Sequence, residues 1–354
     1  MTVLKERLHR AGIHPYGSKE LELYEQRLTR FFTREYRREA EQQHTLEAFG
    51  ITTDQGATWE QTDDLMLVHY DQPLAFFQSF LDQDYLAYSM ASYGDSAELA
   101  LNSDRTLEQA QEAKFKLICE RAGIQGNERI LNIGCGFGSF ETYLFQHYPD
   151  AEVVAVTASK TQADYIRDQQ DNGDHVLSRA NLQLIENDID AIPPETLGLD
   201  SFDLVISIAV FEQVNNLDAI FRTMSSLLRP DGRIFLHLIV SQPVFPKYFD
   251  ARETPVGEYF PGGRVWPHRI LLEQQAHVEL VNGWYINGMN YWRTLDEWHR
   301  RFWVNIDSLY GSILDEDGVR YWNNYFSVCK VVLFAPNRGE FFGNGHYLYR
   351  KREQ

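Results

Sequence analysis

The chain has 354 residues, of which 44% are hydrophobic and 14% aromatic, so it can bury the core of one large domain or of two. Its 51 acidic residues outnumber the 33 Lys and Arg, and the formal net charge is −18. This charge repels phosphate backbones and anionic membrane surfaces, so we expect no nucleic-acid partner and a neutral or cationic ligand.

The three cysteines lie in apolar segments without metal-ligand spacing, so we expect no metal site and a reduced, cytoplasmic setting. Residues 1–17 are polar and lack the apolar core of a secretory signal. The apolar stretches 204–211 and 234–240 are too short to span a bilayer. We therefore expect a protein without stable membrane insertion.

The first third of the chain is predicted to be mainly helical. Apolar residues recur with a partly helical period over residues 20–49, and a second apolar and aromatic helix is predicted over 73–81. Turn-forming and polar residues at 51–64 indicate a connection between them.

A stronger helix is predicted over residues 106–120. Thr106 suits its N-cap position, Gln109 follows three residues later, and Gly123 suits its end.

Residues 128–138 read ERILNIGCGFG, which indicates a buried strand, a glycine turn and a helix that begins near Ser139. Glycine has no Cβ to collide with a bound group, and a helix N-terminus directs free N–H groups at polar ligands. The sequence therefore predicts a nucleotide or nucleoside site. The alternative is a tight connection that binds nothing.

The spacing of the turn separates two kinds of nucleotide site. Gly134, Gly136 and Gly138 form GxGxG, whereas a dinucleotide site needs GxGxxG and an acidic residue about 20 positions later. The next strand ends at Thr157 without such an acid. A nicotinamide oxidoreductase is therefore set aside as a minor alternative. The turn resembles the first motif of the S-adenosylmethionine-dependent methyltransferases.

Strands and helices alternate after the turn, which is typical of a doubly wound parallel sheet. In such a sheet ligands bind beyond the carboxyl ends of the strands. The predicted strands are 152–157, 182–186, 202–209 and 233–240, and the predicted helices between them include 160–170 and 217–228.

Three features together resemble one family: the pair Tyr88-Ser89, the helix that opens TLEQAQEAK, and the glycine turn. This family contains the cyclopropane fatty acid synthases, the mycolic acid cyclopropane synthases and methyltransferases, and the coclaurine-type N-methyltransferases. The resemblance runs from about Tyr85 to the C-terminus.

This resemblance implies an α/β fold: a doubly wound, Rossmann-like class I methyltransferase sheet with an N-terminal helical extension and a helical lid insertion. The implied parts are a helical cap at 1–84, a cofactor-binding core at 85–241, a substrate lid at 242–310, and C-terminal strands at 311–354.

The resemblance implies S-adenosylmethionine as the cofactor and assigns residues to each of its parts. The implied cofactor-binding residues are Tyr88 and Ser89 at the methionine part, Gly134, Gly136 and Gly138 in the turn, Thr157, Ala158 and Gln162 around the ribose, Asp188 and Ile189 at the adenine, and Ala209 at the end of the fourth strand.

Glu212 follows a predicted buried strand, and an unpaired buried carboxylate is costly, so a functional or hydrogen-bonded role is expected. The resemblance implies that this glutamate acts in both branches of the family. Two departures weaken an amine-methylating mechanism copied from the N-methyltransferases: Gln213 replaces a histidine, and Ala209 replaces a second glutamate.

The cyclopropane branch implies a second candidate cofactor, bicarbonate, which removes a proton after an alkene is methylated. The resemblance places Glu212, His237, Ile239 and Tyr291 among its ligands, while Met90 replaces a cysteine. The structural alternatives are a core histidine at His237 and an aromatic filler at Tyr291.

The segment YFPGG at 259–263 resembles the family's lid, and its aromatic residues suit an amine or an alkyl chain equally. A helix is predicted over 295–309, and the chain is predicted to end in two strands, 328–334 and 345–349.

We therefore predict an S-adenosylmethionine-dependent methyltransferase that acts on a soluble small molecule, at an amine nitrogen or an unsaturated carbon. The predicted catalytic residues are Glu212, His237 and Tyr291. The alternative is a cyclopropane synthase or C-methyltransferase that acts on an unsaturated acyl lipid with bicarbonate as base. A third hypothesis, motivated by Ala209 and Gln213, is a catalytically silent cofactor-binding protein. The methyl acceptor is the expected partner, and a homodimer is a candidate assembly.

Overall fold

The computed structural model describes residues 2–59, 69–248 and 254–352. Within these ranges it contains one mixed sheet of eight strands, in the order β3-β2-β1-β4-β5-β8-β7, with β6 paired to β5 outside this path. Strands β1 to β5 run parallel, and β8 runs antiparallel to both of its neighbours. The strands are β1 (Arg129–Ile133), β2 (Glu152–Thr157), β3 (Asn181–Glu186), β4 (Phe202–Ile208), β5 (Leu228–Ser241), β6 (Trp266–Pro267), β7 (Val278–Asn287) and β8 (Phe342–Lys351). The predicted doubly wound α/β sheet is confirmed.

Helices cover both faces of the sheet, so the inner strands are apolar on both sides. Ile130 belongs to a core cluster with residues of α6, α7 and α8 on one face, while its neighbour Leu131 belongs to a second cluster, with residues of α10 and α11, on the other. These helices, with the short α9, are α6 (Leu107–Ala122), α7 (Ser139–His147), α8 (Lys160–Asp171), α9 (Pro194–Leu197), α10 (Leu217–Leu227) and α11 (His268–Leu272).

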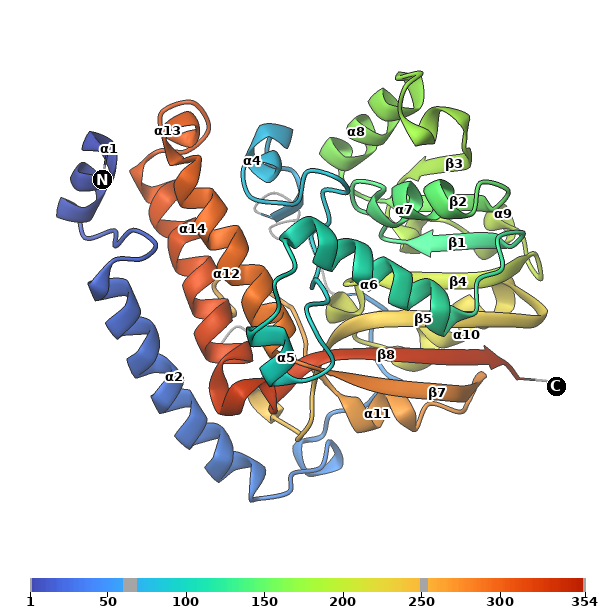
Figure 1. Cartoon of the computed structure of the whole chain (residues 1–354). Coiled ribbons are helices and arrows are strands. Elements are labelled where there is room, and N and C mark those ends of the chain that lie inside the picture. The colour runs from blue at the N-terminus through green and yellow to red at the C-terminus, as the bar shows by residue number, and fades with distance from the viewer. Residues whose placement is uncertain (1, 60–68, 249–253, 353–354) are drawn as a thin grey trace.

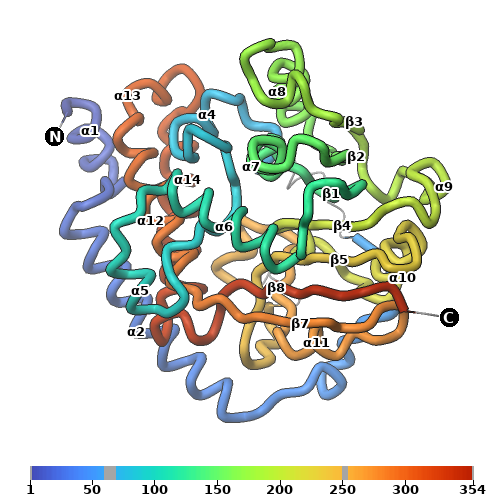
Figure 2. Tube along the Cα trace, turned by 45° about the vertical axis from the view of Figure 1, so that its right-hand side comes forward, coloured from blue at the N-terminus to red at the C-terminus, as the bar shows by residue number. Residues whose placement is uncertain are grey.

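A second layer of helices lies beyond the carboxyl ends of the parallel strands (Figure 1). Its aromatic core joins segments that are far apart in the sequence, and α5 packs against α12 in both views (Figures 1 and 2). The layer contains α1 (Val3–Arg10), α2 (Lys19–Ala40), α4 (Leu74–Gln78), α5 (Ala97–Leu101), α12 (Met289–Val304), α13 (Ile306–Leu309) and α14 (Glu316–Val328). Among the described helices, none is both long and apolar enough to cross a bilayer.

The strongest local predictions are confirmed. Helix α6 has Thr106 as N-cap in a complete capping box with Gln109, and it ends at Gly123 in the left-handed conformation. Helix α7 begins at Ser139, directly after the glycine turn.

The prediction of a strand at 328–334 is wrong. Helix α14 instead continues into a π-helical segment, Cys329–Phe334, in which every residue is buried. A short apolar run has the same appearance in a fully buried helix and in a buried strand, so its periodicity could not separate the two. The other predicted C-terminal strand, 345–349, lies within β8 and is confirmed.

Three further differences concern the edges of the fold. Helix α2 ends at Ala40, before the predicted end at residue 49, and the chain turns at Gln43, whose φ is 48°. Helix α1 and the edge strand β7 were not predicted. Of the predicted connection at 51–64, residues 60–64 lie outside the described part of the chain.

Candidate active site

The glycine turn joins β1 to α7, and its three glycines have positive φ angles of 78° at Gly134, 58° at Gly136 and 71° at Gly138. A Cβ on Gly134 would lie 2.3 Å from Cγ2 of Val210, so this position permits close contact with the segment after β4. A Cβ on Gly136 would meet no atom within 4 Å. Because Gly136 also lines a cavity, its missing side chain leaves room for a ligand.

An open cavity lies at the carboxyl ends of β1, β2 and β4, where ligands of doubly wound sheets bind. All predicted cofactor residues except Gly138 line it: Tyr88, Ser89, Gly134, Gly136, Thr157, Ala158, Gln162, Asp188, Ile189 and Ala209. Gly138 instead forms the N-cap of α7, where a Cβ would lie 3.2 Å from Ile166.

The donors and acceptors of the cavity fit S-adenosylmethionine. The Thr157 hydroxyl donates to Oε1 of Gln162 at 2.7 Å, which orients a polar group beside the expected ribose position. Two buried acceptors, Oδ1 of Asn132 and Oε1 of Gln213, have no hydrogen-bond partner among the described residues and belong to lining residues. Unpartnered buried acceptors next to a cavity are expected where a ligand or water supplies the missing donors.

Several lining residues were not predicted, among them Trp59, Tyr70 and Asn132. Asn132 carried a usable signal, because it is the polar residue within an apolar strand, and its amide donates to Oε1 of Glu141 at 2.6 Å. Trp59 and Tyr70 come from the segment before the core, where nothing in the local sequence indicates that the chain returns to the strand ends.

Glu212 lies in a 3₁₀ turn, Phe211–Gln213, directly after β4. Its Oε1 accepts a hydrogen bond from the backbone N–H of Ile239 at 2.7 Å. Its Oε2 is buried and has no hydrogen-bond partner among the described residues. Burial raises the pKa of Glu212 to about 7, although the Ile239 N–H opposes this shift. Near neutral pH the carboxylate can therefore accept a proton.

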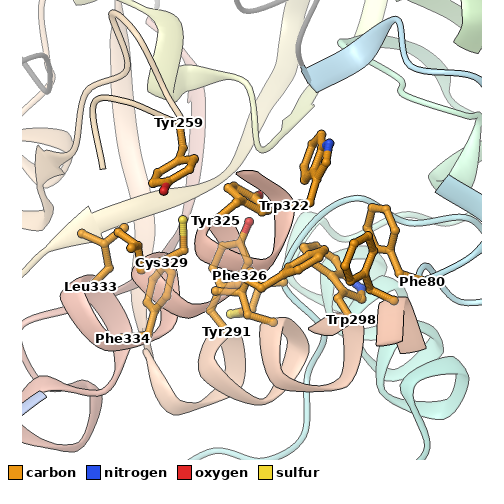
Figure 3. Close-up of a cluster of buried hydrophobic side chains, with 14 of the residues drawn as sticks. Phe80, Tyr259, Tyr291, Trp298, Trp322, Tyr325, Phe326, Cys329, Leu333 and Phe334 are labelled. Atoms are coloured by element: carbon orange, nitrogen blue, oxygen red, sulfur yellow. The ribbon is translucent and has the colours of Figure 1, made fainter. Parts of the chain in front are cut away.

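Figure 3 shows an aromatic cluster, which we call the aromatic wall, and the charge of Glu212 acts on one of its members, Tyr291. Its members are Phe80, Tyr259, Tyr291, Trp298, Trp322, Tyr325, Phe326, Cys329, Leu333 and Phe334. Tyr259 comes from the predicted lid and lies across from Tyr325 and Cys329 (Figure 3). The Tyr88 hydroxyl donates to that of Tyr325 at 3.2 Å, so the wall adjoins the cofactor cavity.

Tyr291, in the first turn of α12, stacks on Phe334 with ring centroids 4.5 Å apart. Burial raises its pKa well above the usual value, and the charge of Glu212 raises it further. The phenol therefore stays protonated near neutral pH and can donate a hydrogen bond.

His237, the third predicted catalytic residue, does not line the cavity. Its Nδ1 lies 2.7 Å from Nε2 of His346, and its Nε2 lies 3.1 Å from the amide nitrogen of Asn344. Burial lowers its pKa well below the usual value, and the charges of Lys114 and Arg121 act in the same direction. Both ring nitrogens of a neutral imidazole are thus engaged inside the protein.

The backbone of His237 nevertheless contacts the cavity wall, because its carbonyl accepts a hydrogen bond from the N–H of Ala209 at 2.7 Å. Ala209 has a φ of 59°, a conformation that costs energy for a residue with a side chain. His237 therefore helps to hold a strained residue at the end of β4.

The family model described as mycolic acid cyclopropane synthetase matches residues 59–338. The chain is 27% identical over 264 residues to (S)-coclaurine N-methyltransferase of Thalictrum flavum subsp. glaucum, covering 71% of both chains. It is 28% identical over 274 residues to the cyclopropane-fatty-acyl-phospholipid synthase of Escherichia coli K12, covering 75% of this chain and 63% of that protein.

Among solved structures, coclaurine N-methyltransferase bound to N-methylheliamine and SAH superposes with a TM-score of 0.76 at 23% identity, covering 98% of this chain and 97% of that one. This similarity confirms the predicted class I methyltransferase fold across nearly the whole chain, including the N-terminal helices.

Proposed function

The chain belongs to the mycolic acid cyclopropane synthetase family and is an S-adenosylmethionine-dependent methyltransferase, and from this premise we propose that it methylates a soluble small molecule, preferably at an amine nitrogen. The observation that supports this proposal is the unpartnered Oε2 of Glu212, with a carboxyl pKa of about 7, beside the aromatic wall. An amine approaches such a site as a cation and must lose its proton before it can attack.

Both parts of this site suit an amine. The faces of tyrosine and tryptophan rings attract cations, and a desolvated carboxylate attracts them more strongly. A carboxyl group whose pKa lies near the working pH can also take the proton that the ammonium releases. Neither property is needed to bind a neutral alkyl chain.

We further propose how the cavity residues divide the cofactor. Tyr88 and Ser89 hold the amino acid part, and the backbone of Gly134 and Gly136 lies against it. Thr157, Ala158 and Gln162 surround the ribose, Asp188 and Ile189 contact the adenine, and Ala209 lies near the transferred methyl group, while Gly138 shapes the turn. When bound, S-adenosylmethionine supplies an electrophilic methyl group.

In this proposal the protein contributes mainly orientation and a site that excludes water. Glu212 holds the acceptor and takes its proton, and the Tyr291 hydroxyl orients it. His237 is a positioning residue, since its carbonyl fixes Ala209 and its ring bonds to neighbouring strand β8.

The alternative acceptor is an unsaturated acyl lipid with bicarbonate as base, a reading that the similarity to the Escherichia coli synthase keeps open. Two of the implied bicarbonate ligands are less suited to it here. The Ile239 N–H already bonds Glu212, and both ring nitrogens of His237 have partners. We therefore rank this alternative second.

Release of S-adenosylhomocysteine tests these substrates directly. The panel should contain aromatic secondary and tertiary amines and vesicles of cis-unsaturated phospholipid, each with and without bicarbonate. We expect turnover of an amine that does not depend on bicarbonate. Turnover of vesicles alone, lost on removal of bicarbonate, would establish the lipid alternative, and cofactor binding without any turnover would support the silent-protein hypothesis. Light scattering during gel filtration would report whether the protein forms the proposed homodimer.

A further inference from the structure

Lys114 lies in the middle of α6 and is only 1% exposed. Its Nζ donates a hydrogen bond to the Ser89 hydroxyl at 2.8 Å and lies 3.8 Å from the centroid of the Phe115 ring. Asp82 acts on it electrostatically, but within the described residues no salt bridge joins its Nζ to a carboxylate. A buried ammonium group without a paired anion is costly, so this position needs an explanation.

The surroundings of Lys114 hold the 85–89 loop against α6. The two carboxylate oxygens of Asp82 accept backbone N–H groups from Tyr85 at 2.6 Å and Ala87 at 2.7 Å. The Gln111 amide donates to the carbonyls of Ala87 at 3.3 Å and Ser89 at 3.0 Å. The Asp82 carboxylate is therefore occupied by backbone donors, and it acts on Lys114 only through space.

The loop also places the Ser89 hydroxyl between the ammonium group and the cavity. Ser89 and Phe115 both line the cavity, and Lys114 contacts both of them from behind. A hydroxyl that accepts a bond from an ammonium group keeps its own O–H free to donate. The ammonium charge polarises this O–H, so it becomes a stronger donor toward an anion.

We propose that Lys114, acting through the Ser89 hydroxyl, supplies the positive charge that recognises the α-carboxylate of S-adenosylmethionine. This inference rests on the proposed placement of the methionine part at Tyr88 and Ser89. The carboxylate is the one anionic group of the cofactor, and Lys114 is the buried cation behind the residue that would touch it. Burial lowers the pKa of Lys114 to about 7, and a carboxylate bound in front of Ser89 would favour its charged form.

Lys114 is thus a positioning residue, and its role predicts selectivity between two ligands that differ only in the carboxylate. The probes are S-adenosylmethionine and decarboxylated S-adenosylmethionine, with dissociation constants measured by titration calorimetry. We expect Lys114→Met to weaken binding of the first by about tenfold to a hundredfold, as for a lost hydrogen bond to a charged group. Binding of the second should change by less than about twofold.

Lys116 on the same helix is the matched control, because it is exposed and pairs only loosely with Glu120 at 4.0 Å. Lys116→Met should change neither dissociation constant. Equal losses for both ligands in Lys114→Met would show a merely structural role and overturn the inference.

Two measurements keep the test decisive if Lys114→Met does not fold. The wild-type protein should bind S-adenosylmethionine at least about tenfold more tightly than the decarboxylated ligand, and Ser89→Ala should reduce this ratio. A wild-type protein that binds both ligands equally would refute the role of Lys114. A wild-type protein that binds neither would instead refute the proposed cofactor site.

Discussion

At the scale of single residues, the proposed chemistry depends on Glu212, whose two carboxylate oxygens have different surroundings. One is held by the Ile239 N–H and the other is free of partners among the described residues. Glu212→Gln keeps the acceptor for Ile239 but cannot take a proton. We expect kcat to fall by about a hundredfold or more, while the dissociation constant for S-adenosylmethionine stays unchanged. The control is Glu195→Gln, which changes an exposed glutamate on α9. Full activity in Glu212→Gln would exclude a role of Glu212 as base.

The raised pKa of Glu212 gives a second prediction, in the pH dependence. The ionised carboxylate is the active form, so kcat/KM should rise with pH through about 7 and this rise should be absent in Glu212→Gln.

The free energy of unfolding should change with pH in the opposite direction and fall as pH rises. The folded-state pKa is raised from 4.5, so the stability contributed by the protonated carboxyl is complete below 4.5 and is lost as pH rises through about 7.

Glu212→Gln should therefore gain stability relative to wild type between about pH 5 and pH 8, by at most about 3 kcal/mol. Thermal unfolding at the two pH values measures this difference. A difference that does not grow with pH would show that the carboxyl is not desolvated in solution.

Gly136 supports a prediction about the cavity itself. The Cβ in Gly136→Ala would point into open space that we assign to the cofactor, at a φ of 58°. We expect weaker binding of S-adenosylmethionine by about tenfold or more, with a loss of stability of about 1 kcal/mol. Gly173→Ala, also without an atom within 4 Å of its Cβ but on the surface, should change neither quantity. Unchanged cofactor affinity in Gly136→Ala would show that the ligand lies elsewhere.

At the scale of elements, α6 holds the 85–89 loop, and its ends are fixed by local contacts. Thr106→Ala removes the N-cap acceptor of the Gln109 N–H and should cost about 1 kcal/mol of unfolding free energy. Gly123→Ala should cost more than Thr106→Ala, because the residue has a φ of 69° and its Cβ would lie 2.8 Å from a guanidinium nitrogen of Arg233. Denaturant unfolding of both variants, with Lys116→Ala as an exposed control, tests this order. A Gly123→Ala variant as stable as the control would contradict it.

The same helix shows why some elements could be predicted from sequence. Capping residues and the glycine turn act through neighbours in the chain, so their signals are local. Helix α6 was therefore predicted with nearly correct ends, and the start of α7 at Ser139 was predicted correctly. The π-helical segment Cys329–Phe334 and β7 depend on tertiary packing. Every residue of the first is buried, and the second is an edge strand that, among the described strands, pairs with β8 alone.

The candidate site follows the same division. Residues at strand ends were predicted because a parallel sheet brings those ends together, and Thr157, Asp188 and Ala209 all line the cavity. Lys114 was not predicted to lie near the site, because a lysine within a polar helical sequence is typical of a solvent-exposed position. Its burial depends on the 85–89 loop, which crosses α6 at a place that no local pattern specifies.

At the scale of the whole molecule, an ion cluster centred on a buried lysine joins α2 to α12 and to the π-helical segment Cys329–Phe334. Lys330, 1% exposed, lies 3.0 Å from a carboxylate oxygen of Glu25 on α2 and 2.9 Å from one of Asp296 on α12. The second oxygen of Asp296 accepts the Tyr16 hydroxyl at 2.8 Å. Since the aromatic wall uses the same π-helical segment and α12, this cluster supports the proposed acceptor site from outside.

Lys330→Met would leave two partly exposed carboxylates, Glu25 and Asp296, without the cation that pairs with both of them. We expect a loss of about 1.5–3 kcal/mol of unfolding free energy, because charge-assisted contacts are lost while the surviving carboxylates keep part of their hydration. Lys247→Met, which breaks a half-exposed pair with Glu39, should cost less than about 1 kcal/mol. Denaturant unfolding measures both, and limited proteolysis should cut the region before residue 45 faster in Lys330→Met alone.

Neutralising the remaining carboxylates separates lost charge pairing from lost packing. If repulsion and desolvation cause the defect, adding Glu25→Gln and Asp296→Asn to Lys330→Met should recover at least about half of the lost free energy. Activity should recover in parallel, because α12 carries Tyr291 and Trp298 of the aromatic wall. A triple variant no more stable than Lys330→Met would mean that the lysine side chain acts through its packed aliphatic stem, and the N-terminal helices would then depend on that packing for their attachment.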